Sequence, residues 1–338
     1  MSASYVVRPV ALDDIPALEA LARQAARGVH TLPRTPENLL RAVRRSIASF
    51  AAQVEIPSEE SYMFVLQDAA GGVAGCATIF ATAGSNGTYF AFRNDVVQQV
   101  SRDLNISHNV HALSLCSELT ACSQLSSFFI HPQAQTEAAL LSRARLLFAA
   151  MAPQRFGDRF FVSLAGVSDA NGQSPFWDAL GRKFFQMDFL DAEHAVEGAR
   201  NRTLIVELMP HYPVYVPLLP AAAQAVLGQS HPEAELPFSL LSAEGFAADE
   251  YIDIFDGGPI LQAHRDSLRT VQQARRYQVA AGQADAEAAD WLVGSVRQAD
   301  FRAAHLRAAL RDDVLLLDAA QMAALRVQAG DEVLCVPA

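Results

Sequence analysis

The stretch Leu125-Ser-Ser-Phe-Phe-Ile130 predicts a β-strand, and the stretch Thr136-Glu-Ala-Ala-Leu-Leu-Ser-Arg-Ala-Arg-Leu-Leu-Phe-Ala-Ala-Met151 predicts a long helix directly after it. The helix is amphipathic, because its apolar residues recur at the helical period. Those that share one stripe are Ala139, Leu140, Ala144, Leu147 and Met151. A buried strand that leads into such a helix is typical of folds that combine helices with a sheet.

Further strands are predicted on both sides of this stretch. They cover Tyr62–Leu66, Val73–Ala81, Tyr89–Arg93, Val110–Leu115 and Phe160–Leu164. A helix that begins at Pro36 precedes them. Helices on a mixed sheet give the α/β (α+β) class.

The chain of 338 residues is long enough for about two domains, at roughly 150 residues each. Pro175-Phe176 precedes Phe184 by the same interval that separates Pro237-Phe238 from Phe246, a weak echo that suggests two related halves. We predict halves at 1–190 and 191–280 and a small β-rich region at 281–338. In that last region Gly330-Asp331 is a hairpin-type turn signal.

Composition excludes several classes of function. A net charge of −11 argues against a nucleic-acid or anionic-membrane partner, because both require a basic face. Four scattered cysteines do not form a disulfide scaffold, and no apolar run approaches the ~18 residues of a membrane span. The N-terminus lacks the pattern of a signal peptide, so we expect a cytoplasmic protein. Lys183 is the one lysine and follows no phosphate-loop motif.

Acidic residues gather in one segment. Between Thr203 and His264 there is no Lys or Arg and there are eight acidic residues. Such a segment can concentrate a cationic substrate, or it can be a solvated surface. Within Tyr251-Ile-Asp-Ile-Phe-Asp-Gly-Gly-Pro259, Asp253 is the better candidate for binding a cation. In a strand, Asp253 and Asp256 would face opposite sides and would not form a carboxylate pair. The sequence Asp256-Gly257-Gly258 favours a turn.

None of the nine histidines lies at metal-ligand spacing, so no metal site is predicted. His231 stands out because it lies in the turn Gly228-Gln-Ser-His-Pro232, at the start of the most acidic part of the chain. Turns carried by a rigid framework often present acid/base residues. From spacing alone, an ordinary surface histidine is the favoured interpretation.

Several of these segments resemble the arginine N-succinyltransferase family. They are Ser174-Pro-Phe-Trp-Asp-Ala-Leu-Gly-Arg-Lys-Phe-Phe185, Glu207-Leu-Met-Pro-His-Tyr-Pro-Val-Tyr-Val-Pro-Leu-Leu-Pro220, the His231 turn and the Asp253 segment. The resemblance covers nearly the whole chain and, within the family, is strongest to the alpha subunits of arginine/ornithine succinyltransferases. It implies a fold like that of the GCN5-type acyl-CoA N-acyltransferases. It also implies succinyl transfer from succinyl-CoA to the α-amine of arginine, and also of ornithine, in arginine catabolism.

The resemblance assigns roles residue by residue. The family's proton donor falls on His231, and its CoA-contacting position falls on Phe128, beside Phe129. Succinyl-CoA is then a co-substrate, with no permanently bound cofactor, and a homologous beta subunit is an expected partner. Amides near Phe128 and Phe129 would stabilise the oxyanion formed on the thioester, and Asp253 would bind the substrate cation.

One departure from the family pattern leaves a second interpretation open. The stretch His131-Pro-Gln-Ala-Gln-Thr-Glu-Ala-Ala139 has neither the glycines nor the arginine that hold the CoA pyrophosphate before the long helix. The chain is therefore either a catalytic succinyltransferase that uses His231, or a non-catalytic partner that completes the active site of a beta subunit.

Overall fold

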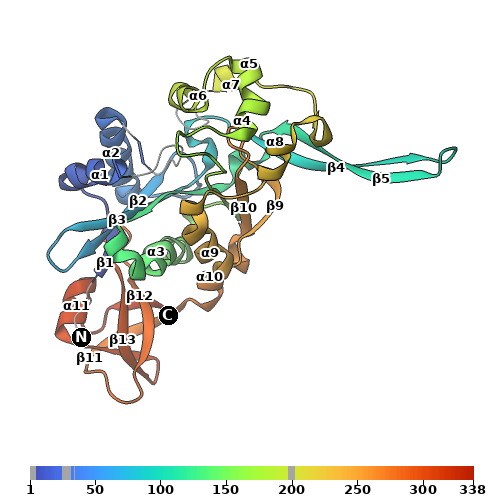
Figure 1. The fold of residues 1–338 in the computed structure, drawn as a ribbon. Helices are drawn as coiled ribbons and strands as arrows, with labels where there is room; N and C mark the ends of the chain where they lie inside the picture. The colour runs from blue at the N-terminus through green and yellow to red at the C-terminus, as the bar shows by residue number, and fades with distance from the viewer. Residues whose placement is uncertain (1–4, 25–31, 34, 197–201) are drawn as a thin grey trace.

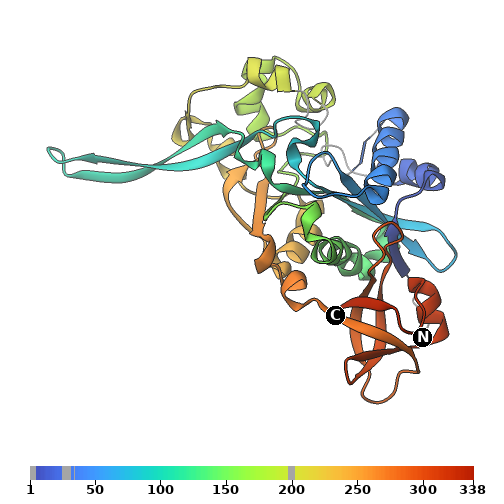
Figure 2. The ribbon, with the colours of Figure 1, turned by 180° about the vertical axis from the view of Figure 1, so that it is seen from behind.

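The computed structural model describes residues 5–24, 32–33, 35–196 and 202–338, and three parts are visible in its ribbon (Figure 1). A layered body of sheet and helices lies in the middle. A long two-stranded ribbon projects from one side of this body, and a small group of strands near the C-terminus lies at its lower end (Figures 1 and 2).

The body contains a continuous mixed sheet. In spatial order its strands are β1 (Tyr5–Pro9), β2 (Ser61–Asp68), β3 (Val73–Phe80), β6 (Ser123–Ile130), β7 (Arg159–Ser163), β10 (Pro259–His264), β9 (Ala247–Ile252), β4 (Ala91–Ser101), β5 (Ile106–Cys116) and β8 (Val214–Tyr215). Neighbours in this order run antiparallel, except β6 and β7, which run parallel. The prediction of helices on a mixed sheet is confirmed.

Strand β2 shows how helices cover both faces of the sheet. Its alternate residues Tyr62, Phe64 and Leu66 join the core under helix α3 (Ala138–Met151). Met63 and Val65, between them, join a second core. That core lies under α1 (Ile15–Ala22) and α2 (Pro36–Ala51). The period of two in a strand places successive side chains on opposite faces, so this apolar run is buried throughout.

Further helices cover the rest of the body. Those beside α3 are α9 (Glu235–Glu244) and α10 (Arg269–Gln273). Those packed over the bases of β4, β5 and β9 are α4 (Pro175–Ala179), α5 (Gly181–Phe185), α6 (Phe189–Val196), α7 (Arg202–Leu208) and α8 (Ala221–Val226). Trp177, fully buried, is at the centre of this second group. No helix among the described residues is long and apolar enough to cross a membrane.

The last strands close on themselves. They are β11 (Arg275–Ala281), β12 (Ala289–Ser295), β13 (Ala303–Arg311), β14 (Val314–Leu317) and β15 (Glu332–Pro337), with α11 (Ala319–Leu325) between the last two. The pairings β11–β15, β15–β12, β12–β13, β13–β14 and β14–β11 form a complete ring, which we call the C-terminal barrel. Its inner side chains form a separate apolar core.

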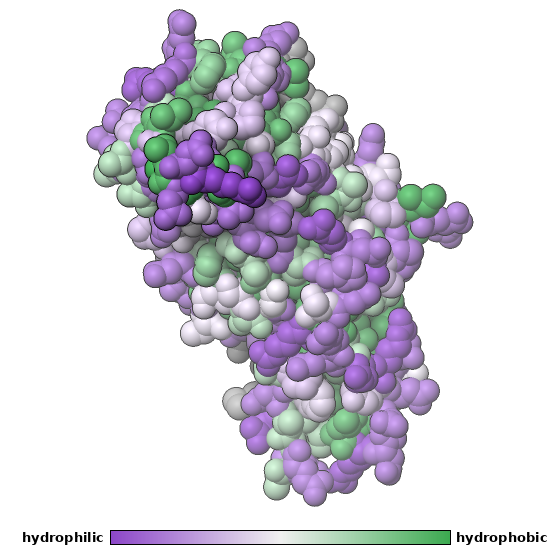
Figure 3. All heavy atoms as spheres, turned by 90° about the vertical axis from the view of Figure 1, so that its right-hand side faces the viewer, coloured by the Kyte–Doolittle hydropathy of each residue, from purple (hydrophilic) through white to green (hydrophobic). Residues whose placement is uncertain are grey.

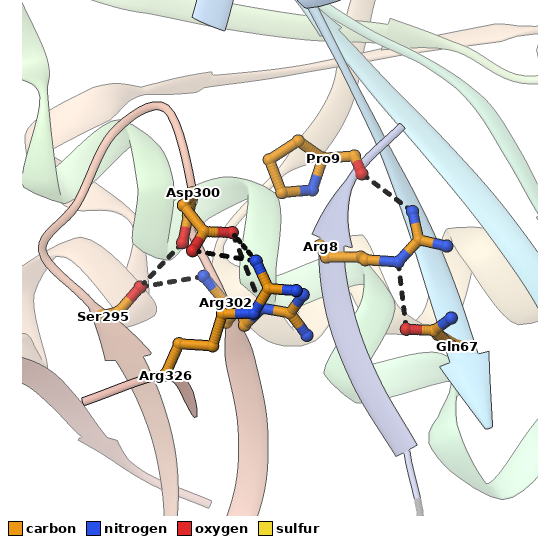
Figure 4. Close-up of polar contacts among 7 residues, drawn as sticks. All are labelled: Arg8, Pro9, Gln67, Ser295, Asp300, Arg302 and Arg326. Atoms are coloured by element: carbon orange, nitrogen blue, oxygen red, sulfur yellow. Dashed lines mark hydrogen bonds and ion pairs between the residues drawn. The ribbon is translucent and has the colours of Figure 1, made fainter. Parts of the chain in front are cut away.

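The barrel joins the body through β1, since Val7 pairs with Ala303 of β13. Polar contacts flank this junction (Figure 4). Asp300 accepts two hydrogen bonds from Arg326, and on the β1 side Arg8 donates to Gln67 and to the carbonyl of Pro9. The barrel is therefore fastened to the edge of the main sheet by both backbone and side-chain contacts.

Some details differ from the sequence-based prediction. Strand β4 continues beyond Arg93 to Ser101, and β5 begins at Ile106 rather than Val110, because a polar ribbon lacks the apolar alternation by which strands are found. Gly330-Asp331 turns from α11 into β15 and joins no hairpin, since β15 pairs with β11 and β12. The halves bounded at residues 190 and 280 stay a prediction.

Candidate active site

Strands β6 and β7 begin side by side and then separate. Their parallel pairing consists of Ser123 with Phe160 and Gln124 with Phe161. Beyond it the register of β6 against β3 shifts, and Ser127 takes a left-handed conformation with φ +52°. A bulge of this kind bends a strand and re-aims the side chains that follow. The separation leaves the C-terminal half of β6, which includes Phe128 and Phe129, unpaired on the β7 side.

Phe128 and Phe129 lie on opposite faces of the sheet, as successive residues of a strand do. Phe129 pairs with Cys76 and packs against the core under α1 and α2. Phe128 packs toward α3, where the guanidinium of Arg145 lies 5.5 Å from its ring centroid. Arg145 is buried without a carboxylate partner among the described residues, and this burial lowers its pKa to about 9. The two predicted CoA-contacting positions thus lie on β6 directly after the bulge.

His231 lies against the exit of β7. Its backbone amide donates to the carbonyl of Ala165 at 2.7 Å, and the neighbouring Ser230 bridges Gly166. Its side-chain Nδ1 accepts a hydrogen bond from the backbone amide of Glu233 at 3.2 Å. A nitrogen that accepts an N–H cannot itself carry the proton in the neutral ring, so Nε2 carries it. The half-buried imidazole is therefore held with its Nε2–H directed away from the Glu233 amide.

Asp253 and Asp256 lie together in one turn, and the prediction that they face opposite sides of a strand is wrong. Strand β9 ends at Ile252, so the two carboxyl groups belong to the turn that follows. Asp256 accepts hydrogen bonds from the amides of Gly166, at 2.7 Å, and Gly258, at 2.8 Å. Asp253 accepts from the amide of Phe255 at 2.8 Å and from the hydroxyl of Ser163 at 3.2 Å.

No cation compensates this pair of carboxyl groups among the described residues. Burial, and then the neighbouring Asp253, raise the pKa of Asp256 to about 7. Burial also raises the pKa of Asp253, although its hydrogen bonds oppose the change. Burial and the closeness of the two carboxyl groups both disfavour negative charge here. A positively charged group that reached the half-buried Asp253 would therefore be stabilised there.

The turn at 253–258 packs tightly on the end of β7. A Cβ on Gly166 would come within 2.7 Å of the carbonyl oxygen of Asp256, and one on Gly258 within 2.4 Å of that of Leu164. The amide of Gly228 donates to the carbonyl of Gly257 at 2.9 Å. One turn thus holds both the exit of β7 and the start of the His231 loop.

A small cavity opens beside this turn. It has a volume of about 210 Å³, and its wall includes Gly228, Asp249, Tyr251 and Pro259. A more open and more polar pocket continues from it toward Arg93, Asp95 and Glu250 at the base of the ribbon. The sequence did not predict which residues form the wall of this cavity, and it indicated only that the segment is acidic. No signal in the sequence shows that β9 would meet β4 here.

The start of α3 is unlike an anion-binding site. A 3-10 helix, Pro132–Glu137, precedes α3, and Glu137 is its N-cap residue. The Glu137 carboxylate lies 3.8 Å from Nδ1 of His305 in the barrel, and burial raises its pKa. A helix N-terminus attracts anions, but a carboxylate of the chain already lies at this one.

As to metals, no group of three or more His, Cys, Asp or Glu in the described residues could hold an ion.

Two family models together match almost the whole length of the chain. The model described as "Arginine N-succinyltransferase beta subunit" matches residues 5–270, and the model of that subunit's C-terminal domain matches residues 275–337. The chain belongs to the arginine N-succinyltransferase family. The resemblance found in its motifs is confirmed, and members of this family are acyltransferases.

Individual relatives are similar to this chain over most of its length. The chain is 45% identical over 301 residues to "Arginine N-succinyltransferase subunit alpha" of Pseudomonas aeruginosa, which covers 88% of this chain and 89% of that one. It is 36% identical over 334 residues to subunit beta of the same organism, with 98% of both chains covered. Among solved structures, subunit AI of the Pseudomonas aeruginosa arginine/ornithine succinyltransferase superposes with a TM-score of 0.89, at 40% identity and with 99% of both chains covered.

Proposed function

We propose that this chain catalyses transfer of the succinyl group of succinyl-CoA to the α-amine of L-arginine, with His231 as the proton donor. The observation that carries the proposal is the tautomer of His231. Because Nδ1 accepts the Glu233 amide, the neutral ring holds its proton on Nε2 and can donate it. Ornithine, with its shorter cationic side chain, is a second candidate substrate.

The proposed transfer forms one C–N bond, breaks one C–S bond and moves one proton to the sulfur. The neutral amine attacks the thioester carbonyl, a C–N bond forms, and the oxyanion accepts hydrogen bonds from strand amides exposed by the separation of β6 from β7, near Phe128 and Phe129. The C–S bond then breaks, the CoA thiolate takes the Nε2 proton of His231, and Nε2 takes the extra proton of the nitrogen in its place, so that the ring ends the step neutral. A thioester seated along β6 would face the His231 loop, because that loop is bonded to the exit of the neighbouring strand β7.

The substrate cation is best placed at Asp253. This carboxylate is half-buried, has no cationic partner among the described residues and lies on the turn that holds the His231 loop. A guanidinium that entered the adjoining cavity would supply the missing positive charge.

CoA binding is the weakest part of the site in this chain. The Glu137 carboxylate at the start of α3 disfavours a pyrophosphate there, which supports the alternative that the chain completes the site of a homologous beta subunit. We therefore propose that a homologous second subunit is the working partner, that succinyl-CoA is bound only as a substrate, and that the protein acts in the cytoplasm.

The test is a pair of histidine variants, His231→Ala and His264→Ala, assayed with and without the beta subunit by release of CoA thiol. His264 is a matched control, because its Nδ1 also accepts a backbone amide, that of Asp266 at 3.3 Å, at the far end of β10. We expect His231→Ala to lower turnover by about 10²–10⁴-fold and His264→Ala to leave it unchanged. Equal turnover in the two variants would show that His231 is no proton donor and that the chain has the partner role.

A further inference from the structure

Arg145 carries a charge in the interior of the body. Hydrophilic side chains cover much of the molecular surface, as the face shown in Figure 3 illustrates, and water solvates charged groups there. Among the described arginines, only Arg143, Arg145 and Arg155 are buried. Arg145 lies on α3 and is 2% exposed. A charge taken out of water costs free energy unless partners compensate it, so each buried arginine requires an explanation.

The other two buried arginines have strong partners. Nε of Arg143 lies 3.1 Å from a carboxylate oxygen of Glu244. Arg155 donates five hydrogen bonds of 2.6–3.1 Å to the side chains of Tyr62 and Gln298 and to the carbonyls of Ser49 and Ala52. The contacts of these two arginines hold separate elements of the fold together, which explains their burial.

Arg145 has neither a counter-ion nor short hydrogen bonds. Its three bonds are 3.2–3.5 Å long and go to the carbonyl and hydroxyl of Ser142, on the same helix, and to the carbonyl of Thr78 on β3. No carboxylate in the described part of the chain pairs with it, and it stays positively charged at neutral pH because burial lowers its pKa only to about 9. An apolar side chain of similar length would fill this space without the cost of desolvation. Packing therefore does not explain why this residue is an arginine.

The guanidinium of Arg145 lies behind the β6 bulge. Thr78, whose carbonyl it contacts at 3.5 Å, pairs with Ser126, directly before the bulge residue Ser127. Phe128, directly after that residue, has its ring centroid 5.5 Å from the guanidinium. The charge is thus next to the part of β6 whose other edge is unpaired on the β7 side, where the proposed thioester lies.

We propose that Arg145 is a positioning residue for succinyl transfer, whose buried charge acts across the backbone of β6 and stabilises the negative charge that forms on the thioester oxygen. This inference rests on the proposed function. Neighbouring strands lie about 4.8 Å apart, so a charge on one side of β6 and an oxyanion on the other are separated by a distance on the order of 10 Å. At an effective dielectric constant of about 20, a positive charge at this distance accelerates the reaction by about tenfold.

Methionine variants of two buried arginines test this role. Arg145→Met removes the charge but keeps an unbranched side chain that fills the space, and Arg155→Met is the matched control. Both are assayed with the beta subunit by release of CoA thiol, and both are unfolded in urea. We expect Arg145→Met to lower kcat by about tenfold, to leave the KM for succinyl-CoA unchanged, and to be at least as stable as the parent. Arg155→Met should keep the parent kcat and lose stability, because buried acceptors lose their donor.

A glutamine variant separates the charge of Arg145 from its hydrogen bonds. Arg145→Gln can still donate to a carbonyl but is neutral, so it should be as slow as Arg145→Met. The parent kcat in either variant, or a loss of stability in Arg145→Met as large as in Arg155→Met, would overturn the inference and leave the proposed function in place. A parent chain that transfers no succinyl group, with or without the beta subunit, would overturn the proposed function and this inference with it.

Discussion

The carboxylate of Asp256 accepts a hydrogen bond from the backbone amide of Gly166 at 2.7 Å, and so joins the turn after β9 to the exit of β7. The residue before Gly166, Ala165, accepts the backbone amide of His231. Asp256 is therefore a positioning residue for the His231 loop, and it acts without contact to substrate.

Replacing Asp256 by Asn should remove a pH dependence of stability. Its folded-state pKa is raised to about 7, so between about pH 4 and pH 7 the folded chain binds more protons than the unfolded chain. The free energy of unfolding of the parent chain should therefore fall as the pH rises through this window, by an amount on the order of 2 kcal/mol.

Urea unfolding of both proteins at pH 5 and pH 8 measures this difference. Asp256→Asn should lose little stability between the two pH values, although at pH 5 it should be less stable than the parent because one amide loses its acceptor. The same fall with pH in the variant as in the parent would assign the dependence to other groups.

Replacing Asp253 by Asn should weaken arginine binding specifically. The variant keeps an acceptor for the Phe255 amide but loses the charge that faces the cation, so the KM for arginine should rise by about tenfold. The KM for succinyl-CoA should stay the same. Steady-state kinetics with Asp249→Asn as the comparison decides between Asp253 and the carboxylate that lines the cavity. A rise confined to Asp249→Asn would move the cation site to Asp249.

Replacing Glu137 by Gln should strengthen CoA binding. The change removes the negative charge at the start of α3, and a helix-terminus charge contributes about 0.3–1 kcal/mol, which is a gain of about threefold in affinity. Isothermal titration of the full chain with CoA measures the effect. Glu55→Gln, at an exposed site in a loop, provides the same change of net charge. An equal gain in both variants would show that overall charge, and not the start of α3, limits binding.

Removing Glu244 should destabilise the body. Oε1 of this buried residue lies 3.1 Å from Nε of Arg143, and Oε2 accepts the amide of Thr270 at 2.8 Å, so the carboxylate links α3, α9 and α10. Glu244→Ala leaves a buried guanidinium without its partner and should cost about 3–5 kcal/mol. Glu332→Ala, which breaks the exposed pair with Arg276, should cost less than about 1 kcal/mol. Urea unfolding that gave similar losses for the two variants would contradict the buried-pair argument.

Local features of this fold were predictable from local sequence. Helix α11 begins at Ala319, directly after Asp318, which forms a capping box with Gln321, and such a box is visible in the sequence itself. Strand β6 and helix α3 are also present where segments 125–130 and 136–151 predict them. The spacing of the apolar residues and the length of each segment suffice to define these two elements.

The arrangement of the site was not predictable, because it depends on contacts between distant segments. The bond between Asp256 and Gly166 spans 90 residues, and no periodicity records it. The error over Asp253 and Asp256 came from extending β9 past Ile252, because the Gly257-Gly258-Pro259 signal comes only after Asp256. His231 and the β6 positions came from family resemblance, and the structure adds the loop geometry that gives His231 its tautomer.

The pairing of Val7 with Ala303 also has a consequence for synthesis of the protein. While the ribosome makes the chain at about 5–20 residues per second, one edge of β1 has no strand to meet until nearly three hundred further residues have been added. During that interval the nascent chain presents an open edge, the feature by which incomplete chains associate with one another. Closure of this edge must therefore wait until β13 has been made, and chaperones that shield emerging strands should matter most before that point.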